Sequence, residues 1–183
     1  MKTYSHGGDL VYFPNPFYKP TIAFKRLCAE AKLPTKAYKG DAGIDFYTIE
    51  AQTFYPEERR KINTGLAAII PEGYALIFKD RSGWGNKGLH CLAGVIDQGY
   101  NGEIIITIQN LTNVSCSPNS WDDGSWDDAT VNVPAGGKIA QALLLPVPDV
   151  TITEWLGELP TSERGNKGFG SSDKIEPKKE IKK

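Results

Sequence analysis

The sequence predicts an all-β fold of the barrel or double-sheet class. Short apolar runs, many of them rich in β-branched residues, recur along the chain, and glycine and proline separate them. Only one stretch, which begins near Ser82, has the features of an α-helix, and it is short. The 183 residues are 40% hydrophobic and 23% charged, which suits one globular domain with a sizeable core.

The predicted elements follow in chain order. Residues 1–20 are rich in aromatic residues, proline and glycine without periodicity, so we expect an extended arm that lies on another surface. Residues 29–35 are expected to form a loop, or one helical turn that Pro34 stops. The predicted strands cover residues 21–27, 60–63, 66–70, 74–79, 104–108 and 138–147, and residues 38–47 are expected to form a turn that leads into a strand.

Composition excludes several classes of function. The net charge of −1 does not suggest a general nucleic-acid or membrane-surface role. No apolar run approaches the roughly 20 residues of a membrane span, and the N-terminus lacks a secretory signal. Cys28, Cys91 and Cys116 are expected to be reduced thiols of a cytoplasmic protein, or of the host cytoplasm for a viral chain. With only His6 and His90, neither a zinc site nor a Ser/His/Asp triad is expected.

One stretch places an acid on flexible backbone between two apolar runs. The runs are residues 94–96 and 104–108, and the segment from Asp97 to Gly102 between them has hairpin composition. Gly99 and Gly102 can take a positive φ there. We expect two buried strands that hold Asp97 rigidly at the rim, where a carboxylate can act as a base. The alternative is a plain turn with a solvated aspartate.

Two further stretches carry polar groups at a strand end and within a strand. Arg81, Ser82 and Gly83 close a strand and open the predicted helix, where main-chain N–H groups, a guanidinium and a hydroxyl suit an anion. An ordinary capping serine is the alternative. Gln141 lies inside an apolar strand, and a buried amide needs partners that a ligand or the main chain supplies.

The last candidate segment, residues 164–172, combines charge, glycines, one aromatic ring and two hydroxyls. Such a segment can close over a phosphorylated ligand with Phe169 stacked on a base, and a flexible tail is the alternative.

Asp45 and Asp97 can orient a metal-bound water. Because no cluster of carboxylates is close in sequence, Mg²⁺ would be held mainly by substrate phosphates.

The order of these stretches resembles that of the trimeric dUTP diphosphatase (dUTPase) family. Five segments match its motifs in sequence, namely residues 42–46, 81–85, 94–97 with Tyr100 and Gly102, 137–141, and 164–165 with 168–171. The resemblance implies a β jelly-roll subunit and a homotrimer with three shared active sites. It also implies hydrolysis of dUTP to dUMP and diphosphate, which limits uracil in DNA and supplies dUMP for dTMP synthesis.

The resemblance also implies a role for each matching residue. Asp97 would activate the water that attacks the α-phosphorus, and Asp45 would orient water in the shell of a Mg²⁺ cofactor. Tyr100 would pack on the deoxyribose and exclude a 2′-hydroxyl, while Phe169 would cover the uracil ring. The residues implied to bind substrate are Arg81, Ser82, Gly83, Gly94, Val95, Ile96, Tyr100, Gln141, Arg164, Phe169, Gly170 and Ser171.

Four positions within the matching motifs depart from the family pattern. Asp80 stands where proline is usual, and its charge would weaken phosphate binding unless the side chain turns outward. Lys138 replaces an arginine, which loses a two-pronged hydrogen-bonding group. Gly99 stands where an acid is common, and Lys167, where glycine is usual, can add a phosphate contact.

The resemblance divides the chain into regions. These are an N-terminal extension at residues 1–20, a jelly-roll domain at 21–160 with an insertion at 111–135, and a flexible arm at 161–183 that carries the fifth motif. The insertion repeats a Ser-Trp-Asp-Asp sequence, which places Trp121 and Trp126 among four acids. Either these rings contact a protein partner or neighbouring subunit, or they fold back onto the barrel.

Three rival functions remain to be weighed. A dCTP deaminase of related fold needs a glutamate at the position that aligns with Thr107, and threonine cannot serve as that acid or base. A regulatory protein that keeps the nucleotide fold but works by binding a partner is favoured only by the Trp/Asp repeat. A structural jelly-roll protein would leave residues 164–172 without a purpose.

Overall fold

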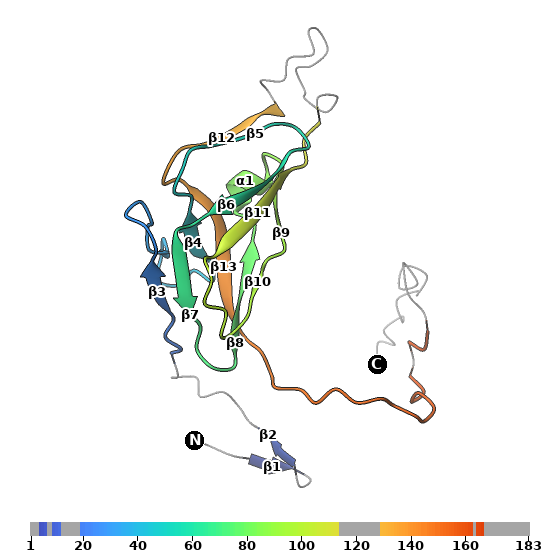
Figure 1. Cartoon of the computed structure of the whole chain (residues 1–183). Helices are drawn as coiled ribbons and strands as arrows, with labels where there is room; N and C mark the ends of the chain where they lie inside the picture. Colours follow the sequence, from blue (N-terminus) through green and yellow to red (C-terminus); the bar gives the residue numbers. More distant parts are fainter. Residues whose placement is uncertain (1–3, 7–8, 12–18, 114–128, 163, 167–183) are drawn as a thin grey trace, which may run out of the picture. The chain divides into compact units, whose positions relative to one another are not determined.

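The computed structural model describes residues 4–6, 9–11, 19–113, 129–162 and 164–166. The chain divides into two compact units, residues 1–149 and residues 150–183 (Figure 1). All of the strands and the helix belong to the first unit, so the predicted β class is confirmed. No helix in the described ranges has the length and apolar character needed to cross a membrane.

The strands of the first unit form antiparallel sheets (Figure 1). One sheet has the order β10 (Val95–Ile96), β8 (Tyr74–Lys79), β13 (Lys138–Pro146) and β4 (Ile44–Tyr47). A second has the order β6 (Arg59–Asn63), β11 (Ile105–Asn110) and β9 (Leu89–Leu92). Three strand pairs are β12 (Val131–Val133) with β5 (Gln52–Phe54), β3 (Ala23–Arg26) with β7 (Leu66–Ile69), and β1 (Tyr4–His6) with β2 (Asp9–Val11).

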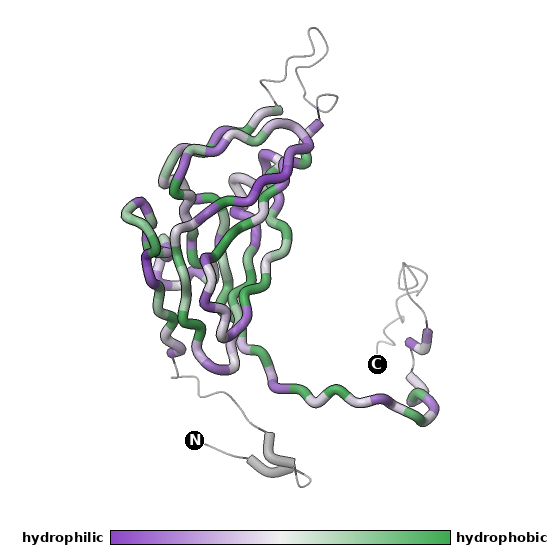
Figure 2. Tube along the Cα trace, viewed as in Figure 1, coloured by the Kyte–Doolittle hydropathy of each residue, from purple (hydrophilic) through white to green (hydrophobic). Residues whose placement is uncertain are grey.

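The core is built from the inward side chains of both larger sheets. Alternate residues of a strand point to opposite faces, so Ile106 and Ile108 of β11 are buried with their neighbour Ile62 of β6. Phe46 of β4 and Phe78 of β8 meet edge to face, with their ring centres 4.8 Å apart. Hydrophobic residues follow β7, β8 and β13, whereas β6 is largely hydrophilic (Figure 2).

The helix predicted near Ser82 is present as α1 (Ser82–Gly85), a single turn. Arg81 occupies the N-cap position and no side chain caps the helix, so Ser82 is not the capping residue. Trp84 fixes the turn to the sheet, because its indole Nε1 donates a 2.6 Å hydrogen bond to the carbonyl of Lys138 on β13.

The structure contains short strands that sequence patterns do not predict. β5, β9 and β12 have three or four residues each, and β12 lies within the predicted insertion. Ala129, Val131 and Val133 are buried, so residues 129–133 belong to the β fold. β1 and β2 pair within the stretch for which an extended arm was predicted.

The hairpin predicted around Asp97 is wrong in its pairing. β10 pairs only with β8, whereas β11 pairs with β6 and β9, so residues 97–104 connect two sheets. The expected burial also fails for β10, since Val95 is 59% exposed. Of the two glycines that can take a positive φ, Gly99 has one, of 83°, and Gly102 does not. A two-residue strand at a sheet edge cannot be told from a buried strand by its apolar composition.

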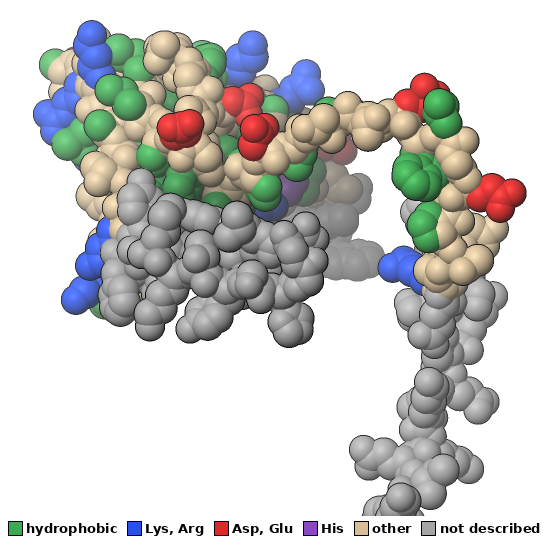
Figure 3. Space-filling model, turned by 90° about the horizontal axis from the view of Figure 1, so that it is seen from below, with side chains coloured by type: hydrophobic (Ala, Val, Ile, Leu, Met, Phe, Trp, Pro, Cys, Tyr) green, Lys and Arg blue, Asp and Glu red, His purple; other side chains and the backbone are tan. Residues whose placement is uncertain are grey.

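The second unit presents apolar side chains over its described residues. Ile152 is 92% exposed, and Leu156 and Leu159 are almost as exposed. The indole Nε1 of Trp155 donates a hydrogen bond to the carbonyl of Glu158, which shapes a local turn. Figure 3 shows hydrophobic side chains along this segment.

Candidate active site

The outer face of the four-stranded sheet carries a row of polar residues. Gln141 of β13 lies between Asp45 of β4 and Lys79 of β8 in the strand register. Cross-strand partners share a face, and the residues on either side of Asp45 point into the core, so this row points outward. Asp41, Gly43, Asp45, Arg81, Ser82 and Gln141 help to line a surface pocket of about 360 Å³.

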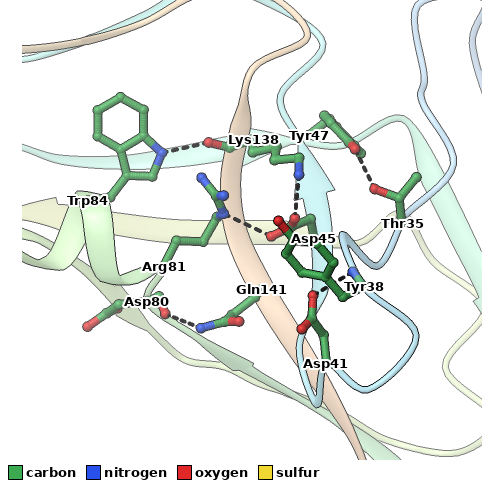
Figure 4. A network of polar contacts seen from close by, with 10 residues as sticks. All are labelled: Thr35, Tyr38, Asp41, Asp45, Tyr47, Asp80, Arg81, Trp84, Lys138 and Gln141. Atoms are coloured by element: carbon green, nitrogen blue, oxygen red, sulfur yellow. Dashed lines mark hydrogen bonds and ion pairs between the residues drawn. The ribbon is translucent and has the colours of Figure 1, made fainter.

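Asp45 is held by two cations (Figure 4). Arg81 Nε donates to one carboxylate oxygen at 2.8 Å, and Lys138 Nζ donates to the other at 2.7 Å. Burial raises the pKa of Asp45, but the hydrogen bonds and charges of Lys138 and Arg81 outweigh it and hold the pKa below 3.8. The same contact, chiefly the hydrogen bond from Asp45, raises the pKa of Lys138. Asp45 is therefore an anion that neutral solution does not protonate.

Gln141 is oriented by its neighbours on both sides. Its Nε2 donates a 2.7 Å hydrogen bond to the carbonyl of Asp80. Its Oε1 lies against Gly43, where a Cβ atom would come within 2.0 Å of that oxygen. Any side chain at position 43 would displace the amide, so the glycine is required by close approach. An amide nitrogen carries two hydrogens, and one of them is left for a ligand.

Asp97 directly follows β10 and lies apart from this pocket. Together with Gly73, Gln98 and Asp149 it lines a different pocket of about 420 Å³. The main-chain N–H of Tyr100 donates to the carbonyl of Asp97, which closes a turn. Gln98 Oε1 accepts a hydrogen bond from the N–H of Gly73 and ties the turn to the start of β8. The carboxylate of Asp97 has no ion pair within the described part of the chain.

Tyr100 folds back over its own turn. Its hydroxyl donates a 3.0 Å hydrogen bond to the carbonyl of Glu103. A Cβ atom at Gly102 would come within 2.5 Å of that hydroxyl and 2.6 Å of the ring. Gly102 therefore makes room for the tyrosine and is not needed for an unusual backbone angle. Tyr100 is 45% exposed, so part of the residue is accessible to solvent.

An apolar row separates the two pockets. Leu143, Ile77 and Val95 are cross-strand neighbours on the outer face, one row beyond Gln141. None of the three belongs to the core or packs against it. Val95 and Leu145, which lies in the following row, are exposed, whereas Leu143 and Ile77 are partly buried. The sheet thus presents a polar pocket at one end, a partly exposed apolar band, and Asp97 at the other end.

Comparison with known proteins gives this arrangement a family. The dUTPase family model matches residues 29–119. Deoxyuridine 5′-triphosphate nucleotidohydrolase of Leifsonia xyli subsp. xyli is 36% identical over 144 residues, which cover 77% of this chain and 85% of the relative. The enzyme of the same name from Clostridium kluyveri is 35% identical and covers 82% and 96%.

The chain belongs to the dUTPase family. Solved structures agree, since the dUTPase of Staphylococcus bacteriophage 80alpha with dUpNHpp has a TM-score of 0.71 and 31% identity, covering 83% of this chain and 98% of that one. The dUTPase from phage phi11 of S. aureus, whose structure is described as visualising a species-specific insert, has a TM-score of 0.64 and 28% identity, covering 75% and 97%.

The structure brings together only part of the predicted dUTPase site. Asp45, Arg81, Ser82 and Gln141 share one pocket, while Asp97 lines another. Tyr100, Gly94, Val95 and Ile96 lie on the loop and strand beside Asp97. Arg164 belongs to the second unit, and Phe169, Gly170 and Ser171 lie outside the described residues. The roles assigned to these dUTPase motif residues stay predictions.

Sequence patterns miss the contacts that organise the pocket. Asp80, whose charge would weaken phosphate binding unless its side chain turns outward, is directed to β9 and bonds His90. Lys138, noted as a replacement for the family arginine, is a direct partner of Asp45. Trp84 carries no signal beyond its place in the second motif. The contacts of Lys138 and Trp84 join residues that are far apart in the sequence, so no local pattern contains them.

Proposed function

We propose that the chain is a homotrimeric dUTP nucleotidohydrolase of jelly-roll fold, in which each active site joins Asp97 of one chain to the phosphate pocket of another. The hydrolase activity follows from family membership, since relatives of that name align with most of the chain. The observation that carries the shared-site proposal is the separation of Asp97 from Ser82 and Gln141 on one sheet face.

A general base must come within about 3 Å of the water that it activates. The row of Gln141 and the row of Leu145, next to the pocket of Asp97, are four residues apart, or roughly 13 Å along a strand at about 3.3 Å per residue. A phosphorus bound beside Gln141 therefore lies beyond the reach of Asp97 in the same chain. A second chain that covers Leu143, Ile77 and Val95 would bring its own Asp97 to the pocket and bury the apolar band.

Water attack on the α-phosphorus is the chemistry that this site supports. Asp97 takes a proton from the water while the water oxygen bonds to phosphorus, and the bond to the diphosphate oxygen breaks with its electron pair. The carboxylate is suited to this step because it has no ion pair among the described residues and the turn to Tyr100 holds it in place. The ring of Tyr100 would pack on the deoxyribose, as the resemblance implies, and would exclude a 2′-hydroxyl.

Main-chain groups of β10 are available to recognise uracil. β10 pairs with β8 on one side only, so within the described sheet it is an edge strand with unpaired N–H and C=O groups. Uracil presents a donor and acceptors on one edge, which such a strand can match. A cytosine would leave one of these groups unpaired, and that mismatch disfavours it strongly.

The polar pocket suits the phosphates. Arg81 uses Nε on Asp45, so the terminal nitrogens of its guanidinium remain for phosphate oxygens. The hydroxyl of Ser82 and the second amide hydrogen of Gln141 supply further donors. Arg164 and Ser171 of the C-terminal arm would hold the outer phosphates, with Phe169 over the base, as the resemblance implies.

The donor set fits Mg²⁺ only through water. Both oxygens of Asp45 accept hydrogen bonds from cations, and Asp41 accepts one from the N–H of Tyr38. No group of three or more His, Cys, Asp or Glu side chains suits a metal within the described residues. A hard cation held by substrate phosphates would keep waters that Asp45 can orient, and it would stabilise the charge that moves onto diphosphate. A phage phi11 dUTPase structure is described as containing a structural Mg(II) ion.

The direct test is hydrolysis by the purified chain with dUTP and Mg²⁺, followed by diphosphate release, with dCTP, dTTP and UTP as controls. Asp97→Asn should keep nucleotide affinity and lose at least about a hundredfold in turnover, the usual range for a general base. Normal turnover in this variant, measured beside wild type at saturating dUTP, would overturn the assignment of the base.

Deamination of dCTP is disfavoured by the side chain on β11 at the critical position. Thr107 lies between Lys61 and Leu92 in the register, and threonine offers no acid or base for that reaction.

The predicted partner contact at residues 111–135 stays a prediction, because residues 114–128, which include both tryptophans of the repeat, lie outside the described residues.

A further inference from the structure

Asp80 is the single residue between the end of β8 and the N-cap of α1, and it is bonded on three sides. One carboxylate oxygen accepts a 2.5 Å hydrogen bond from the main-chain N–H of Cys91. The other accepts a 2.8 Å hydrogen bond from Nδ1 of His90. Its carbonyl accepts the hydrogen bond from Gln141 Nε2. One residue therefore joins β8, β9 and β13 beside the phosphate pocket.

The carboxylate of Asp80 does not face the phosphates. Asp80 is absent from the lining of the pocket that holds Arg81, Ser82 and Gln141. Figure 4 shows its side chain directed away from Arg81, with only its carbonyl turned toward Gln141. Burial, and then the negative charge of Asp80, raise the pKa of the Cys91 thiol to about 11, in keeping with a carboxylate seated against β9.

The position of the helix that follows Asp80 depends on contacts with neighbouring elements. α1 is one turn, has no buried residue and lacks a side-chain cap, and isolated turns of this length do not persist in water. Trp84 anchors its far end through the carbonyl of Lys138. At the near end, the anchors that the structure provides are the Asp80 contacts and the Arg81 ion pair.

We propose that Asp80 is a positioning residue for phosphate binding. Its carboxylate, clamped by His90 and the N–H of Cys91, fixes the main chain that presents Arg81 and Ser82, and its carbonyl orients the amide of Gln141. This inference rests on the proposed phosphate pocket. Ser82 and Gln141 would bind the phosphates equally strongly in the ground state and in the transition state. Loss of the contacts of the Asp80 carboxylate therefore weakens substrate binding and leaves turnover unchanged.

Steady-state kinetics on Asp80→Ala and Asp80→Asn, with full-length protein, test this role. Asp80→Ala should raise KM for dUTP about tenfold, the factor that one lost charge-assisted hydrogen bond gives, with kcat within about twofold of wild type. Asp80→Asn keeps an acceptor for the N–H of Cys91 and should recover most of that loss. A merely structural residue would instead lower the folded fraction, which reduces apparent kcat and leaves KM unchanged.

Glu58 provides the matched control. Its carboxylate also joins a main-chain N–H, that of Tyr55, to a cation, Arg60, but it lines neither pocket of the site. Glu58→Ala should lower the unfolding midpoint and leave KM unchanged. An unchanged KM in Asp80→Ala, or an equal rise in Glu58→Ala, would overturn the inference. Absence of dUTP hydrolysis by wild type would instead refute the proposed function, so the two failures are distinguishable.

Discussion

At the scale of single residues, two glycines are required by the side chains of other residues. Gly43 leaves space for the amide of Gln141, and Gly102 leaves space for the ring of Tyr100. Neither has a positive φ. The sequence shows that Gly102 can adopt a positive φ, but it does not show that the glycine instead makes room for the ring of Tyr100. The contact that explains it forms only when the turn closes.

Gly102→Ala should change substrate choice more than stability. The new Cβ would meet the outer end of the Tyr100 ring, which is half exposed and can move at little cost. We expect the preference for dUTP over UTP, measured as the ratio of the two kcat/KM values, to fall about tenfold.

The control for this variant is Gly40→Ala. Among the described residues, no atom lies within 4 Å of a Cβ at Gly40, so this change should leave both the preference and the unfolding temperature unaltered. A Gly102→Ala enzyme that still rejects UTP as well as wild type does would show that the position of Tyr100 does not set sugar selectivity.

At the scale of elements, local patterns find the strands that are long and apolar. β8, β11 and β13 were predicted close to their observed bounds because β-branched and leucine-rich runs of six to nine residues stand out. β5 and β12 have three residues each and exist through pairing with one another, across nearly eighty residues of chain. The order of the candidate motifs predicted the residues of the polar pocket. It did not predict the hydrogen bonds of the Asp80 carboxylate or the ion pair of Lys138.

Asp45 on β4 forms ion pairs with Lys138 on β13 and with Arg81 at the N-cap of α1, and these pairs make the free energy of unfolding depend on pH. The folded pKa of Asp45 is below 3.8, so the ionised carboxylate is stabilised in the folded state. Its contribution is complete above the unfolded pKa and is lost as pH falls through the folded value. The difference in unfolding free energy between wild type and Asp45→Asn should be about 1–3 kcal/mol near neutral pH and should shrink below about pH 4.

Denaturant unfolding of both proteins across that pH range measures the difference. Lys138→Gln removes the hydrogen bond that chiefly lowers the pKa of Asp45, so the loss of stability should begin at a higher pH in this variant. A difference between wild type and Asp45→Asn that stays constant down to pH 3, in about the region where the carboxyl titrates, would show that the ion pairs do not shift its pKa.

At the scale of the whole molecule, the proposed function divides the active site between chains, because the pocket of Gln141 and the pocket of Asp97 are separate in one chain. Leu143, Ile77 and Val95 form a partly exposed apolar band on the first unit. The second unit, taken by itself, exposes Ile152 and Leu156. Surfaces of this kind are typical of a chain that associates with copies of itself. The family and the β class could be predicted from sequence, whereas the proposed division of the site depends on register across the sheet.

The most direct measurement of this claim is complementation between two inactive variants. Asp97→Asn lacks the base and Gln141→Ala lacks a phosphate contact, and each alone should be nearly inactive at low dUTP. Equal amounts, unfolded and refolded together, should recover about a quarter of wild-type activity, because that share of sites in a randomly mixed trimer pairs an intact Asp97 with an intact Gln141 from another chain. Mixed oligomers that form but stay as inactive as the separate variants would contradict a shared site.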